Sequence, residues 1–79
     1  MTELTVYTTS WCPFSMLLIT DLDRAGIAFR DIDVDADPEA AEIVRGLNGG
    51  NRTVPTVVFP DGSSLTNPDI SQVVARLGR

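Results

Sequence analysis

Cys12 is the single cysteine of this 79-residue chain, and its neighbours favour a chemical role for it. Pro13 follows it and suits the first turn of a helix, where the missing proline N–H costs nothing. The unpaired N–H groups and the helix dipole at such a position stabilise negative charge. A thiolate is therefore favoured at Cys12, and thiolates attack disulfide sulfurs. The pattern predicts a nucleophile for thiol–disulfide exchange.

Two neighbours of Cys12 bear on this prediction. Ser15 lies three residues later, on the same helical face, and its hydroxyl could donate a hydrogen bond to the thiolate. The alternative is that a lone cysteine is a small buried hydrophobe. Trp11 and the polar residues on the strand side of Cys12 indicate that the segment is not core, which favours the chemical role.

Val54-Pro55 is a second candidate feature, with two interpretations. One is a strand that begins with proline, which is allowed at an edge. The other is a cis peptide that directs the Val54 backbone toward Cys12, where its N–H and C=O could pair with an extended thiol substrate. The residues alone favour the first interpretation, because cis is the minority state of X-Pro bonds.

Alternation and helical periodicity predict the elements that position these residues. Strands are expected at residues 4–8, 27–34, 54–59 and 63–66, and helices at 13–26, from 38 to about 48, and after the start at Asn67-Pro68-Asp69. Asp37 before Pro38 is expected to cap the second helix, and Gly49-Gly50 to end it. Asn67 before Pro68 repeats the cap-and-proline pattern.

The predicted order is β-α-β-α-β-β-α, which combines one parallel crossover with an antiparallel hairpin. This indicates an α/β fold with a four-stranded mixed sheet flanked by three helices. Since no linker or repeat interrupts the sequence, residues 1–79 are expected to form a single domain.

Charge and composition exclude several classes of function. The net charge of −5 argues against nucleic acid and anionic membranes as partners, because both require clustered cations. With one cysteine and no histidine, neither an internal disulfide nor a Cys/His metal cage can form. No signal peptide or membrane-length apolar run is visible, so a cytoplasmic location is expected.

Three stretches resemble the glutaredoxin family, and most closely its actinobacterial mycoredoxins. They are Thr9-Ser10-Trp11-Cys12-Pro13-Phe14-Ser15, the stretch Asn48-Gly49-Gly50-Asn51-Arg52-Thr53-Val54-Pro55-Thr56-Val57, and Asp61-Gly62-Ser63-Ser64-Leu65-Thr66-Asn67-Pro68. The second and third are the specific part of the resemblance, which spans nearly the whole chain.

The resemblance implies a thioredoxin fold, a cis Pro55, and reduction of mixed disulfides between proteins and the small thiol mycothiol. It implies no bound cofactor, a monomer, and mycothiolated partners such as peroxiredoxins. Cys12 would be the attacking thiol and Val54 would bind the cysteinyl part of the small thiol through its backbone. Arg52, Thr53 and Pro55 would complete this contact, with Thr66 and Asn67 at the distal end.

The scarcity of cations in these motifs gives a physical reason to expect mycothiol rather than glutathione as the small thiol. Glutathione carries two carboxylates, which generally recruit lysine or arginine, whereas the sugar and inositol of mycothiol are neutral. Arg52 is the motifs' one cation, and none lies in the first helix before Arg24. Arg52 could contact substrate or pair with the acidic stretch 33–37, and both interpretations stay open.

Ser15 departs from the Cys-x-x-Cys turn that mycoredoxins typically carry. The chain is either a natural one-cysteine protein or an engineered Cys-to-Ser variant. Pro13-Phe14 resembles the dithiol turn Cys-Pro-Tyr-Cys more than the monothiol turn Cys-Gly-Phe-Ser, which favours the second explanation. In both cases Cys12 can act alone on small-thiol mixed disulfides.

Other functions remain as alternatives. One is a glutathione-dependent glutaredoxin, and another is an iron–sulfur carrier in which two chains share a bridging cluster through one cysteine each. Pro13 stiffens the turn in place of glycine and argues against the cluster. A third is a non-catalytic binding domain, in which Cys12 would react no faster than free cysteine.

Overall fold

The computed structural model describes residues 3–78, in which seven elements follow one another in the predicted order. They are β1 (Leu4–Thr8), α1 (Pro13–Arg24), β2 (Phe29–Asp33), α2 (Pro38–Leu47), β3 (Thr56–Val58), β4 (Ser64–Thr66) and α3 (Ile70–Leu77). The predicted sequence of strands and helices is confirmed.

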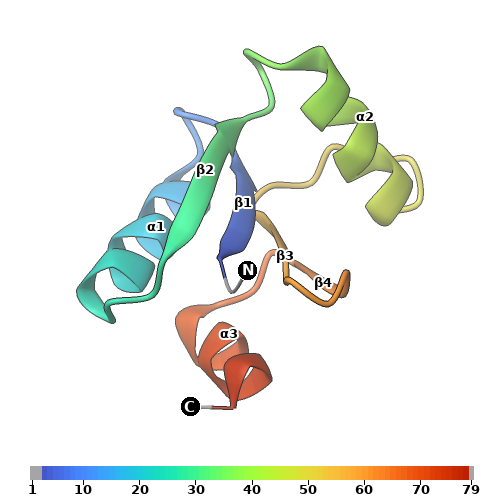
Figure 1. Cartoon of the computed structure of the whole chain (residues 1–79). Helices are drawn as coiled ribbons and strands as arrows, with labels where there is room; N and C mark the ends of the chain where they lie inside the picture. Colours follow the sequence, from blue (N-terminus) through green and yellow to red (C-terminus); the bar gives the residue numbers. More distant parts are fainter. Residues whose placement is uncertain (1–2, 79) are drawn as a thin grey trace.

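The four strands form one mixed sheet in the order β2-β1-β3-β4. β1 pairs in parallel with β2, with Leu4 opposite Phe29, while β3 is antiparallel to both β1 and β4. Helices α1 and α3 cover one face of the sheet and α2 covers the other (Figure 1). The predicted parallel crossover is β1-α1-β2, and the predicted hairpin is β3-β4.

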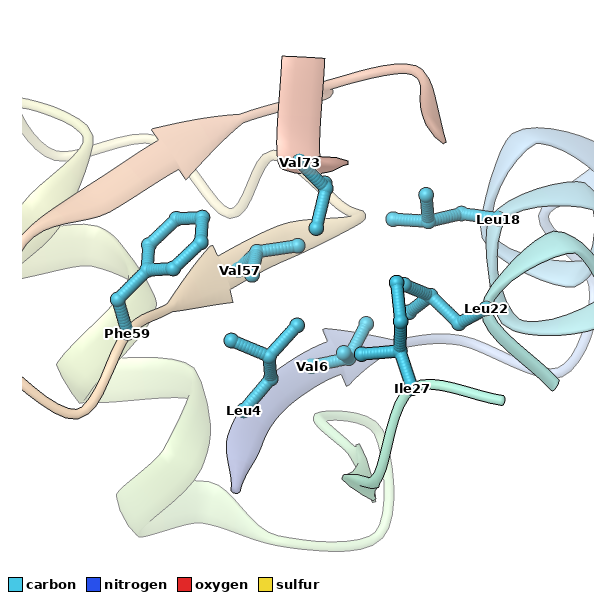
Figure 2. Close-up of a cluster of buried hydrophobic side chains, with 8 residues drawn as sticks. All are labelled: Leu4, Val6, Leu18, Leu22, Ile27, Val57, Phe59 and Val73. Atoms are coloured by element: carbon cyan, nitrogen blue, oxygen red, sulfur yellow. The ribbon is translucent and has the colours of Figure 1, made fainter. Parts of the chain in front are cut away.

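The larger hydrophobic cluster fills the space between the sheet and helices α1 and α3. Its members come from β1, α1, α3 and the segments around residues 27 and 57–59, and they converge on one another (Figure 2). They are Leu4, Val6, Leu18, Leu22, Ile27, Val57, Phe59 and Val73. Since β1 and β3 both contribute, this packing fixes α1 against the centre of the sheet.

A smaller cluster lies under α2, on the opposite face. It comprises Tyr7, Val34, Ala40, Ala41 and Val44. Successive side chains of a strand point to opposite faces, so Tyr7 reaches this cluster while Val6 reaches the larger one.

The helix boundaries follow the predicted signals in two helices and depart from them in the third. Asp37 caps α2 by accepting from the N–H groups of residues 39 and 40, at 3.1 and 3.2 Å. Asn67 is not a cap: Asp69 caps α3, in a reciprocal capping box with Gln72. Gly49 and Gly50 follow α2 with φ of 64° and 101°, a region that favours glycine.

Among residues 3–78, no helix has both the length and the apolar content needed to cross a membrane.

Three strands start later than predicted, because the backbone N–H before each start is either missing or bonded outside the sheet. The Ile27 N–H donates to the Leu22 carbonyl at the end of α1, so β2 starts only at Phe29. Pro55 has no N–H to give, and β3 starts after it. The Ser63 N–H bonds to the Asp61 carboxylate within the turn, which leaves β4 to begin at residue 64.

Apolar residues cover more of the surface of α1 than the face that is buried. Leu18 and Leu22 are 2% and 0% exposed, but Leu17 is 61% exposed. Leu17 belongs to the same run of apolar residues, but its side chain points away from the core.

We expect Leu22→Ala to lower the free energy of unfolding by about 3 kcal/mol, because it leaves a cavity in a closed cluster. Urea unfolding followed by circular dichroism measures this change. Leu17→Ala is the matched control on the same helix and should change stability by less than about 0.5 kcal/mol. Equal losses in the two variants would contradict the packing described.

Candidate active site

Cys12 occupies the N-cap position of α1, in the turn that follows β1. Its carbonyl accepts from the Met16 N–H at 3.1 Å, and Pro13 stands in the first turn as predicted. No side chain caps α1. The N–H groups of the first turn are therefore left for the Cys12 sulfur.

The expectation that this segment is not core is wrong as regards burial. Cys12 is 6% exposed, and Thr8, Thr9 and Ser15 beside it are buried as well. Cys12 nevertheless belongs to neither hydrophobic cluster. The polar neighbours are covered by packing, and the cysteine lies in a polar buried region rather than among aliphatic side chains.

Opposing effects set the pKa of the Cys12 thiol. Burial acts to raise this pKa, because a covered site disfavours the charged form. The Ser15 hydroxyl and the backbone N–H groups of Ser15 and Phe14 act to lower it. Together these donors outweigh burial, and the pKa lies below its ordinary value.

Ser15 is positioned to stabilise the Cys12 thiolate rather than the neutral thiol. Its side chain is 0% exposed, and its hydroxyl makes no hydrogen bond of ordinary geometry within the described residues. The same hydroxyl is the strongest of the groups that lower the pKa of Cys12. An otherwise unpartnered buried donor thus gains most when the sulfur becomes an acceptor.

The Val54-Pro55 peptide bond is cis, as the resemblance implied and against the simpler interpretation of the two residues. The Val54 carbonyl lies 3.9 Å from Sγ of Cys12 and accepts a hydrogen bond from the thiol. Two residues 42 positions apart in sequence are thereby brought together. The Val54 backbone faces the sulfur.

Asn67, which directly follows β4, contacts the same loop. Its N–H donates to the Pro55 carbonyl at 2.7 Å, and its own backbone is left-handed, with φ 48°. Asparagine tolerates this region better than most residues. Asn67 is exposed, and its backbone lies next to the segment that faces Cys12.

Asn48 ties the loop together, although the sequence indicated it only as the end of α2. Its amide nitrogen donates to the Thr53 carbonyl at 3.4 Å and to the Thr56 hydroxyl at 3.0 Å. Its amide oxygen accepts from the Thr66 hydroxyl. Thr53 and Thr66, both expected at the site, are thus linked through a residue whose side-chain role the sequence analysis missed. Its place in the Asn48-to-Val57 motif is the available signal.

Arg52 pairs with the acidic stretch, in agreement with the structural interpretation of this residue. Its guanidinium lies 2.7 Å from the Asp35 carboxylate and also donates to the Val34 carbonyl at 3.4 Å. The other carboxylate oxygen of Asp35 accepts from the Trp11 indole N–H at 2.8 Å. Asp35 therefore joins the turn that carries Cys12 to the loop that carries Val54.

Two exposed aromatic residues flank Cys12 in the sequence. Trp11 and Phe14 are 71% and 65% exposed. A surface pocket of about 210 Å³ begins at Phe14 and runs between α1 and the start of α3. Its walls are Phe14, Leu17, Leu18, Asp21, Asn67, Pro68, Asp69 and Ile70. An apolar surface with little positive charge thus adjoins Cys12.

The site therefore combines a thiol of lowered pKa, a facing backbone carbonyl and an adjoining groove. Within residues 3–78, no group of three or more His, Cys, Asp or Glu side chains could hold a metal ion. The chemistry available to this arrangement is nucleophilic attack by sulfur.

Comparison with known proteins identifies the family. The Glutaredoxin family model matches residues 4–64, which include β1, α1, β2, α2, β3 and the start of β4. The chain belongs to the glutaredoxin family. As a glutaredoxin it is a thiol–disulfide oxidoreductase, and proteins of this family use a small thiol as co-substrate and typically no bound cofactor.

Two relatives align with this glutaredoxin over most of their length. A glutaredoxin-like protein of Mycobacterium tuberculosis is 53% identical over 74 residues, 94% of this chain and 88% of that one. Mycoredoxin 1 of Corynebacterium glutamicum is 46% identical over 77 residues, 98% of this chain and 95% of the relative.

Solved structures show that this glutaredoxin has the thioredoxin fold, as expected. The glutaredoxin-like protein NrdH-redoxin from Escherichia coli superposes with a TM-score of 0.77 and 31% identity, over 95% of this chain and 93% of that one. The glutaredoxin from Methanosarcina mazei gives a TM-score of 0.85 over 99% and 80% of the two chains, at 23% identity.

We expect Ser15→Ala to raise the pKa of Cys12, because it removes a donor to the thiolate. The pH profile of iodoacetamide alkylation should move to higher pH, since only the thiolate reacts. The rate at neutral pH should fall while the plateau rate at high pH is kept. Thr20→Ala, which removes a hydroxyl bonded to the Met16 carbonyl on the outside of α1, should leave the profile unchanged. An unchanged profile in Ser15→Ala would refute the role of the hydroxyl.

Proposed function

We propose that this glutaredoxin reduces mixed disulfides between proteins and mycothiol, with Cys12 as its one working thiol. The observation that carries the proposal is the extent of the similarity to a mycoredoxin, 46% identity over 98% of the chain. The solitary cysteine at the start of α1, with its lowered pKa, supplies the chemistry.

The first step is an exchange at sulfur. The Cys12 thiolate attacks the mycothiol sulfur of the mixed disulfide, the old S–S bond breaks, and the target protein leaves as a thiolate that takes up a proton. Cys12 and mycothiol are then joined by a disulfide. The departing thiol gains the electron pair of the broken bond, so the target is reduced.

The second step releases Cys12. The thiolate of a second mycothiol attacks the bound mycothiol sulfur, forms mycothiol disulfide, and expels Cys12 as its thiolate. The low pKa that favours attack also makes Cys12 a good leaving group. No second protein thiol enters either step.

The surrounding residues are proposed to hold the small thiol. Val54 would pair with its cysteinyl part through the backbone, next to the carbonyl that faces Sγ. Thr66 and Asn67 would lie at its distal end, beside the Pro55 carbonyl. Arg52 and Thr53 would border this path, and Trp11, Pro13 and Phe14 would form the apolar surface met by the target protein.

Mycothiolated peroxiredoxins are proposed as partners, and the cytoplasm as the location. A single free thiol that must stay reduced is suited to a reducing compartment. The chain is proposed to act as a monomer, because the exchange requires no residue from a second copy.

Competition between two disulfides tests the choice of thiol. The reduced chain is exposed to equal concentrations of mycothiol disulfide and glutathione disulfide, and the adducts on Cys12 are resolved by intact-mass spectrometry. The mycothiol adduct should dominate. A dominant glutathione adduct would overturn the mycothiol assignment.

Insulin reduction tests the one-thiol mechanism. The chain should reduce insulin disulfides poorly, because no internal thiol resolves the mixed disulfide formed with a protein. Ser15→Cys should increase this rate by about tenfold or more by supplying a resolving thiol. Ser15→Ala is the control and should bring no gain. Comparable insulin reduction by the unaltered chain and Ser15→Cys would contradict the mechanism.

A further inference from the structure

Asp35 is the shared partner of two side chains from different loops, Trp11 and Arg52. Its Oδ2 accepts from Nε1 of Trp11 at 2.8 Å, and its Oδ1 accepts from Nη2 of Arg52 at 2.7 Å. Trp11 immediately precedes Cys12, and Arg52 lies two residues before Val54. One carboxylate thus touches both loops that form the site.

The contact with Asp35 neutralises the arginine of the Val54 loop. The side chains of Arg52 and Asp35 are 40% and 43% exposed, so solvent reaches the pair, but the two opposite charges remain in direct contact. The Trp11 hydrogen bond and the Arg52 guanidinium hold the pKa of Asp35 below its usual range, and the carboxylate is charged at neutral pH. The Arg52 guanidinium also donates a hydrogen bond to the Val34 carbonyl.

The segments around Cys12 and the adjoining pocket provide no cation to replace Arg52, which is paired with Asp35. Residues 9–23, which contain Cys12 and most of α1, include no lysine or arginine. The pocket beside Phe14 instead carries the carboxylates of Asp21 and Asp69. A small thiol that carries carboxylates would therefore meet negative charge and a cation already paired.

We propose that Asp35 is a specificity-determining residue, which disfavours small thiols bearing carboxylates by holding Arg52 in an ion pair. This inference rests on the proposed function and names the basis of its selectivity. A thiol built on neutral sugars needs hydroxyl and amide partners and loses nothing when Arg52 is occupied. Glutathione, with two carboxylates, would need that guanidinium free.

The other ion pair of the described residues provides a contrast. Arg45 and Glu42 are three residues apart on α2 and connect one helix to itself. Asp35 and Arg52 are 17 positions apart and connect two loops at the site. Breaking the Arg45–Glu42 pair also removes an exposed ion pair, but it frees no cation beside Val54.

Asp35→Asn is the decisive substitution. The amide keeps an oxygen that can accept from the Trp11 indole, but it removes the negative charge opposite Arg52. In the competition between glutathione disulfide and mycothiol disulfide, the ratio of glutathione adduct to mycothiol adduct on Cys12 should rise about fivefold, the upper range for an exposed charge pair. The rise should shrink as salt is added, because salt screens exposed charges.

Two further variants separate selectivity from a structural effect. Asp35→Asn with Arg52→Gln should return the adduct ratio to that of the unaltered chain, because the freed cation is gone. Glu42→Gln should leave the ratio unchanged. A gain that persists without Arg52, or an unchanged ratio in Asp35→Asn, would overturn the proposal, as would equal losses of both adducts.

The adduct ratio also distinguishes this proposal from the choice of thiol. If the unaltered chain favours glutathione, the mycothiol assignment fails, yet the ratio must still move toward glutathione in Asp35→Asn for the role of Asp35 to hold. If the unaltered chain favours mycothiol and the ratio does not move, the role of Asp35 fails alone.

Discussion

Cys12 has to ionise where protein covers nearly all of its side chain, and the site depends on how that is made possible. Burial alone would favour the neutral thiol. The free N–H groups at the start of α1 and the Ser15 hydroxyl reverse the balance. The N–H groups are available to the sulfur because, among residues 3–78, no side chain caps the helix. Helix geometry rather than a neighbouring cation therefore provides the charge stabilisation.

The same sulfur must also meet a second loop, and the sheet determines where that loop lies. β3 pairs with β1 at the centre of the sheet, and Val54 and Pro55 immediately precede β3. Contacts on either side then hold the loop, through the backbone of Asn67 and the side chain of Asn48. Asp35, in the turn after β2, adds a further link. Polar contacts thus hold the loop next to the buried sulfur of Cys12.

Periodicity and capping patterns predicted the order of all seven elements, and the position of Cys12 at a helix start followed from Pro13 alone. The α3 cap was mispredicted, because Asn67-Pro68 repeats the pattern of Asp37-Pro38 while the backbone of Asn67 instead bonds to Pro55. The burial of Cys12 could not be predicted, since it depends on tertiary contacts such as that with the Val54 carbonyl, 42 positions away in the sequence. The partners of Asp35 also depend on tertiary contact: the sequence placed an acid near Arg52 as one of two options, but the bond to Trp11 needed the fold.

Serine at position 15 separates two properties that a second cysteine would combine. Its hydroxyl is a better hydrogen-bond donor than a thiol, so the Cys12 thiolate keeps its local stabilisation. It cannot attack a disulfide, so a mixed disulfide on Cys12 has no exit within the chain. A large protein adduct would then persist, whereas a small-thiol adduct can be cleared by a second molecule of the same thiol. Reactivity is thus retained, while turnover is limited to mixed disulfides that leave a small thiol, and not a protein, on Cys12. Under the proposed function, recognition of that thiol beside Val54 and Arg52 then controls what Cys12 reduces.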